Sequence, residues 1–63
     1  MRKVIKLDWN DVILEDIKFF SEYCDEIVVF GDEMCVVIVN PSPILLKELD
    51  KRGIKYEILD EGD

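Results

Sequence analysis

Residues 26 to 39, EIVVFGDEMCVVIV, constrain the fold of this chain most, because they predict two strands that are apolar on both faces. Side chains alternate between the two faces along a strand, so a sheet covered on one side shows apolar and polar residues in turn. Here Ile27 and Val29 point one way, and Val28 and Phe30 point the other. The partner strand is also apolar on both faces, with Met34, Val36 and Ile38 against Cys35, Val37 and Val39. A chain of 63 residues has enough helix to cover one face, so the second face calls for a cover from outside, most simply another copy.

The size of the chain supports the same interpretation. A chain of 63 residues makes one domain, and such a domain buries only about 60% of its unfolded surface. Small domains often add disulfides, a metal or oligomerisation to this limited core. The chain has only Cys24 and Cys35 and no histidine, and each cysteine lies within an apolar pattern, which favours buried thiols over a bridge. We therefore expect a homodimer or a higher homo-oligomer.

The charge of the chain bears on its partners. Fifteen acidic residues against 8 basic ones give a formal net charge of −7. Such a surface disfavours nucleic acid and anionic membranes, since Lys and Arg supply most of the attraction to phosphates. A protein that mimics nucleic acid and occupies a basic partner stays an alternative, although an acidic surface usually serves solubility.

Location and source are also indicated by the residues. No run approaches the roughly 20 apolar residues of a membrane helix. The start, MRKVIKLDWN, lacks the apolar core and cleavage site of a signal peptide, so we expect a cytoplasmic protein. The chain has no Gln, Thr, His or Ala and is rich in Lys and Glu, a tendency of thermophilic proteins.

Hydrophobic periodicity and capping residues predict the order strand, helix, strand, strand, helix, strand. The elements are expected at residues 2–8, 11–24, 26–39 (a hairpin), 43–52 and 54–59. Asn10 is expected to cap the first helix, and Ser42 followed by Pro43 the second. Gly31-Asp32 is expected to supply the hairpin turn, and Gly53 the end of the second helix.

This order predicts an α+β fold, the split β-α-β sandwich called ferredoxin-like, with a four-stranded antiparallel sheet and two helices on one face. The sheet order is expected to be last strand, first, third, second. The strand Glu26 to Phe30 then lies at an unpaired edge, which monomers usually avoid. Residues 1–60 form the single domain, and the tail at 61–63 is expected to be disordered.

The first helix carries more apolar surface than one buried stripe needs. The stripe at helical spacing consists of Ile13, Ile17, Phe20 and Cys24. Val12, Phe19 and Tyr23 cluster about a quarter-turn to one side. This flank packs against the second helix or meets a partner, and both alternatives stay open.

The loop after the first strand gathers polar side chains. Asp8, Asn10, Asp11 and Glu15 offer oxygen ligands, but they lack the glycine and spacing of a calcium loop, and capping explains three of them. Trp9 either closes the core at the end of the sheet or lines a shallow pocket. Catalysis by Ser21 or Ser42 would need a nearby base such as histidine, which is absent. We expect no enzyme, no cofactor and no metal.

Two segments resemble ACT-type regulatory domains, which share this topology. VIKLDWNDVILEDIKFF reads as a strand that ends in Asp before a loop and helix, and LLKELDKRGIKYEIL as a helix, a Gly turn and a strand. ACT domains usually carry a glycine in the loop after the first strand, whereas this loop reads Asp8-Trp9-Asn10-Asp11. Asp8 is the residue of the pattern that carries over. The resemblance implies a regulatory domain that binds a small ligand in this loop.

Two functional hypotheses follow from the sequence. The first is a non-enzymatic protein-interaction module that self-associates through its sheet and could also bind another protein. Its expected interface residues are Val28, Phe30, Val37, Val39, Phe19 and Tyr23. The alternative is an ACT-like domain whose ligand-binding residues are Asp8, Trp9, Asn10, Asp11 and Val12.

Overall fold

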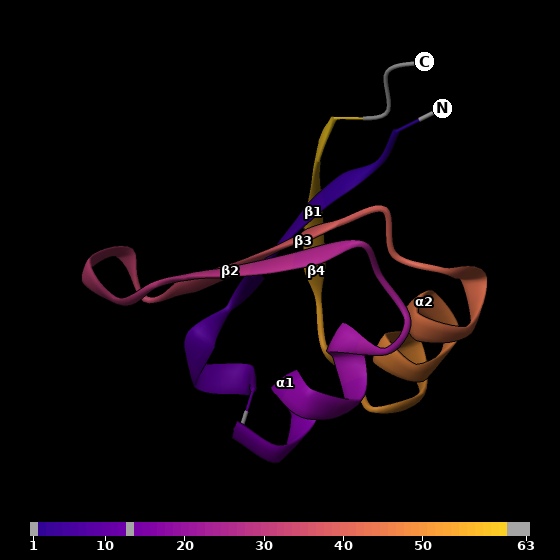
Figure 1. The fold of residues 1–63 in the computed structure, drawn as a ribbon. Coiled ribbons are helices and arrows are strands. Elements are labelled where there is room, and N and C mark those ends of the chain that lie inside the picture. Colours follow the sequence, from indigo (N-terminus) through magenta and orange to yellow (C-terminus); the bar gives the residue numbers. More distant parts are fainter. Residues whose placement is uncertain (1, 13, 61–63) are drawn as a thin grey trace.

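The computed structural model describes residues 2–12 and 14–60, which form one four-stranded sheet beside two helices (Figure 1). The elements are β1 (Val4–Asp8), η1 (Trp9–Asp11), α1 (Leu14–Ser21), β2 (Glu26–Phe30), η2 (Gly31–Glu33), β3 (Cys35–Val39), α2 (Pro43–Lys51) and β4 (Tyr56–Asp60). The strands pair antiparallel in the order β2-β3-β1-β4. Both helices lie on the same side of the sheet (Figure 1). The predicted α+β, ferredoxin-like arrangement is confirmed. The tail at 61–63 lies outside the described residues.

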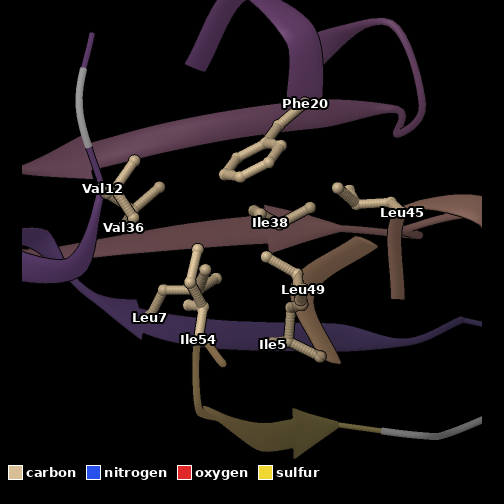
Figure 2. Packing of buried hydrophobic residues seen from close by; sticks show 9 residues of the cluster. All are labelled: Ile5, Leu7, Val12, Phe20, Val36, Ile38, Leu45, Leu49 and Ile54. Carbon is tan, nitrogen blue, oxygen red and sulfur yellow. The ribbon is translucent and has the colours of Figure 1, made fainter. Parts of the chain in front are cut away.

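The strand register places one set of side chains toward the helices. Ile5 pairs with Ile38 and Leu7 with Val36, and all four are buried. Phe20 from α1 and Leu45 and Leu49 from α2 point into the same space (Figure 2). The remaining buried members of this core are Val12 and Ile54. Burying a side chain of this size stabilises the fold by about 1.5–3 kcal/mol, so this layer between sheet and helices is the main source of stability.

The first helix is shorter than predicted. It spans Leu14–Ser21 instead of 11–24, and the one-turn 3-10 helix η1 precedes it. Asn10 does not cap α1, because it lies inside η1, where the carboxylate of Asp8 accepts a hydrogen bond from its backbone N–H (2.9 Å). Of the predicted buried stripe, Phe20 is fully buried and Ile17 and Cys24 pack against the core. Ile13 lies outside the described residues.

The hairpin turns through four residues rather than through Gly31-Asp32 alone. Phe30 pairs with Cys35, and η2 together with Met34 makes the connection. Gly31 does not supply the positive φ; Met34 does, with φ 53° and ψ 44°. Met34 is therefore a turn residue rather than the first residue of β3. Four-residue hairpin loops commonly combine a helical turn with a left-handed residue at the end.

The second helix follows the prediction closely. Ser42 caps it, with its hydroxyl accepting a hydrogen bond from the backbone N–H of Leu45 (3.3 Å), and Pro43 is its first residue. Gly53 takes φ 73° just after its end, the left-handed conformation that glycine adopts without strain. The last strand begins later than predicted, at Tyr56, and its pairing with β1 shifts register between Val4 and Ile5.

Two polar side chains tie distant segments together. Asn40, at φ 52°, accepts a hydrogen bond from the backbone N–H of Lys3 (2.9 Å) and donates one to the carboxylate of Asp25 (2.7 Å). Arg52 joins the helices through Asp16 on α1 (2.5 Å) and Glu48 on α2 (2.8 Å).

The guanidinium of Arg52 also lies over the rings of Phe19 and Phe20, at 5.4 and 5.8 Å from their centroids. The hydrogen bonds that the guanidinium donates to the carboxylates of Glu48 and then Asp16 raise the pKa of Arg52 above its ordinary value.

Candidate interaction surface

The face of the sheet opposite the helices, here called the open face, is apolar over two of its four strands. The register brings Val28 beside Val37, and Phe30 beside Cys35. Val39 lies between Glu26 of β2 and Val4 of β1. We call the apolar residues of this half the open-face patch: Val4, Val28, Phe30, Cys35, Val37 and Val39. No helix within residues 2–12 and 14–60 lies over it (Figure 1).

The members of the patch are shielded to different degrees. Val4 and Cys35 are buried because they lie on the two central strands, among the side chains of their neighbours. Val28, Val37 and Val39 are half-buried, and Phe30 is 42% exposed. The patch therefore has a partly closed centre and an exposed rim, with Phe30 as the large side chain at its outer end.

The other half of the open face is charged. Lys6 of β1 pairs with Glu57 of β4, with 3.9 Å between Nζ and Oε2. Arg2 and Asp60 form a second ion pair at 3.9 Å. Such exposed pairs contribute little to stability, about 0–1 kcal/mol each. The open face thus has an apolar half beside a charged half. Protein interfaces likewise combine an apolar core with a polar rim.

The hairpin of β2 and β3 extends past the helices, so its far end is exposed on both faces (Figure 1). Val29 and Met34 are each 45% exposed there. A hollow of about 520 Å³ lies at this end, lined by Val29, Phe30, Gly31, Asp32 and Glu33. Its lining therefore includes two apolar and two acidic residues.

The structure does not gather the predicted ligand-binding loop, residues 8–12, around one cavity. Asp8 uses its carboxylate to cap η1, and the backbone N–H of Val12 donates to the carbonyl of Trp9 (3.1 Å). Val12 is buried in the core and Trp9 packs against it. Asn10 and Asp11 are exposed. Of these residues, Asp8 alone borders a hollow of about 410 Å³ at the end of the open face, beside Lys6 and Cys35. The ligand-binding hypothesis stays a prediction.

The two aromatic residues predicted for the interface lie elsewhere. The rings of Phe19 and Tyr23 contact each other, with 5.0 Å between their centroids, on the helical side of the sheet. Phe19 lies beneath Arg52, and the carbonyl of Tyr23 accepts a hydrogen bond from the backbone N–H of Ser42 (2.8 Å). These two residues of the flank therefore contact the residues that cap α2, which agrees with the first of the two alternatives, packing against the second helix. The predicted interface residues form two separate groups.

Neither cysteine forms a disulfide, as the sequence favoured. The thiol of Cys24 donates to the carbonyl of Glu26 (3.6 Å), and burial raises its pKa above the ordinary value. Within the described part of the chain, no three or more His, Cys, Asp or Glu side chains are grouped to hold a metal ion. None of the helices described here has the length and apolar character to cross a membrane.

Sequence reasoning missed two features of the exposed surface. Val4 belongs to the open-face patch because it neighbours Val39, which only the strand register reveals. Met34 is exposed because it lies in the turn. No local pattern marked Met34 as a turn residue, because Gly31-Asp32 also suits a two-residue turn with glycine at its first position.

Comparisons of the chain with models of protein families, with curated proteins and with solved structures found no match.

Proposed function

We propose that this protein is a small non-enzymatic interaction module that self-associates through the open face of its sheet. The observation that carries the proposal is the open-face patch, an apolar surface on β2 and β3 that the two helices leave uncovered. Monomeric proteins seldom expose contiguous apolar patches of large area, and such patches usually mark interaction sites.

A two-fold arrangement suits the division of the open face. Two copies that meet through their β2–β3 halves bury the same patch twice, as closed dimers do. Full burial of a Val or Phe side chain is worth about 1.5–3 kcal/mol relative to exposure. Phe30 and the half-buried valines contribute most of this burial free energy, because Val4 and Cys35 are already buried in the single chain. The ion pairs around Lys6 and Arg2 then form a hydrated rim.

A pair of matched substitutions tests the proposal. Val37→Lys places a charge in the centre of the open-face patch, where self-association would bury it without a partner. Ile44→Lys introduces the same side chain on α2, at a position 59% exposed on the helical side of the molecule. Sedimentation velocity at micromolar concentration should show smaller particles for the Val37 variant and unchanged particles for the Ile44 variant.

A variant that does not fold must be told apart from a folded variant that does not self-associate. Circular dichroism checks that each variant keeps its fold. If Val37→Lys does not fold, Phe30→Lys tests the same surface from a position that already contacts solvent. Equal sedimentation of the folded open-face variant and the Ile44 variant contradicts the proposal.

A further inference from the structure

The hydrogen bonds of the sheet determine which backbone groups of β2 point outward. Two backbone hydrogen bonds lie at the two ends of the β1–β3 pairing. The N–H of Trp9 donates to the carbonyl of Met34 (2.9 Å), and the N–H of Asn40 donates to the carbonyl of Lys3 (2.6 Å). Bonded pairs in an antiparallel ladder recur at every second residue. The even-numbered residues of β3 therefore bond β1, and the odd-numbered ones, such as Val37, bond β2. Val28 lies opposite Val37, so Ile27 and Val29 direct their N–H and C=O groups away from the sheet.

This outer edge has few of the features that usually block pairing with another chain. Natural edge strands often carry Pro, Lys or a bulge in the strand. Ile27, Val28, Val29 and Phe30 form an uninterrupted apolar run without Pro or Lys. The opposite edge, β4, differs, because its pairing is irregular beside Val4 and it includes Glu57 and Asp60. The outward groups of β2 are thus the better site for an added strand.

Acidic residues flank this edge at both ends. Asp25 and Glu26 precede the apolar run, and Asp32 and Glu33 follow it. The second pair lines the same hollow as Val29 and Phe30. Apolar residues next to carboxylates suit a Lys or Arg side chain, whose aliphatic part packs while its charge remains hydrated.

We propose that the β2 edge binds an extended segment of another protein, with alternating apolar residues in its centre and Lys or Arg at its ends. The segment adds a fifth strand through the N–H and C=O groups of Ile27 and Val29, the mode known as β-strand addition. A second copy of this chain fits the edge less well. Antiparallel pairing of two β2 strands about Val28 would bring Asp25 of one copy beside the Gly31-Asp32 turn of the other, and each copy has a net charge of −7.

This inference does not depend on the proposed function, because the added strand uses the edge whereas self-association uses the open face. The two also differ in their response to salt. Binding of a basic segment to an acidic edge weakens as salt screens the attraction. Association of two copies that each carry −7 strengthens, because salt screens their repulsion.

The test uses a fluorescent, acetylated and amidated peptide of sequence KRVTVTVKR and fluorescence anisotropy. The protein carries Val37→Lys, so that self-association does not interfere. We expect saturable binding that weakens from low to high salt. A peptide with Glu in place of every Lys and Arg should not bind, nor should one N-methylated on the amides that pair with β2.

Two variants locate the binding on the edge. Val29→Pro removes one outward N–H, and an edge strand tolerates proline. The substitution should lower the affinity for the peptide about tenfold, as expected when one hydrogen bond is lost and the adjacent ones are weakened. Asp32→Asn combined with Glu33→Gln should lower the affinity and flatten its salt dependence. If Val29→Pro does not fold, the N-methylated peptide carries the same test on the unaltered edge.

Three results overturn the inference. The first is equal binding of the N-methylated peptide, which would show that the ladder is not used. The second is equal binding of the acidic peptide. The third is absence of saturable peptide binding. In that case, loss of self-association when Val29→Pro is made in the otherwise unmodified protein would assign the edge to a second copy.

Discussion

Met34 is a left-handed residue with a side chain, and glycine should suit this position of the hairpin better than alanine. Its φ of 53° and ψ of 44° place it in the αL region. Its carbonyl accepts a hydrogen bond from the backbone N–H of Trp9 in η1 (2.9 Å), and its own N–H donates to the carbonyl of Gly31 in η2 (3.3 Å), so two backbone hydrogen bonds hold the conformation. Met34→Gly removes the Cβ that makes this conformation costly, and Met34→Ala keeps it.

The expected difference follows from two opposing effects. A residue with a Cβ costs about 1–2 kcal/mol in the left-handed region. Glycine lowers the stability by about 0.5–1 kcal/mol relative to alanine, because it loses more conformational freedom on folding. Both substitutions lose the same half-exposed side chain, so this loss cancels when the two variants are compared. Met34→Gly should therefore be more stable than Met34→Ala by about 0.5–1 kcal/mol.

Urea denaturation of both variants at one protein concentration measures this difference. The concentration is held constant because self-association changes apparent stability. The slope of the unfolding free energy against urea should be the same for both variants, since neither changes the surface exposed on unfolding by much. A Met34→Ala variant as stable as Met34→Gly would refute the assignment of the turn.

Three further predictions concern other residues. Asn40→Gly keeps the left-handed backbone but removes two side-chain hydrogen bonds, so it should lower the unfolding free energy by about 1–2 kcal/mol in urea titrations, and Asn40→Ala should lower it further. Arg52→Met keeps much of the packing on Phe19 and Phe20 but loses the ion pairs and the cation–ring contacts, so it should lower the unfolding free energy in urea titrations, and by less in high salt. Because burial raises the pKa of Cys24, its thiol should react more slowly with iodoacetamide near pH 8 than after unfolding in urea. The raised pKa also adds stability that is present below the ordinary thiol pKa and lost as pH rises through the folded value, and Cys24→Ser should remove this component of alkaline unfolding.

The order and layering of the elements could be predicted because each rests on a strong local pattern. Two apolar runs separated by an acidic turn identified both hairpin strands in residues 26–39, and Ser42, Pro43 and Gly53 marked the ends of α2. With two helices that can cover one face, the uncovered face followed from the number of elements. These features depend on residues close in sequence.

The loop after β1 and the hairpin turn could not be predicted, because competing local choices had to be decided by distant contacts. Asp8 and Asn10 are both good capping residues, and the backbone hydrogen bond from Trp9 to Met34 fixes the end of β1 so that Asp8 caps η1. In the hairpin, pairing of Phe30 with Cys35 leaves four residues in the turn, so the left-handed position falls on Met34 rather than on Gly31.

The composition of the candidate surface was harder to predict than the fold. Val28, Phe30, Val37 and Val39 share the open face because of strand alternation, and the sequence shows that directly. Phe19 and Tyr23 were linked to the same interface by their apolar character alone. Their contacts with each other, and those of Phe19 with Arg52, place them on the helical side.

The proposed self-association brings two or more copies of this chain together through the open face. Sedimentation equilibrium of the unmodified protein at micromolar concentration, followed by amide hydrogen exchange of β2 and β3, tests it most directly. With self-association, the mass should be at least twice the 7.4 kDa of one chain. On dilution to the monomer, protection should be lost faster in these two strands than in α2. A mass of 7.4 kDa at every concentration, with exchange that does not depend on dilution, would contradict it.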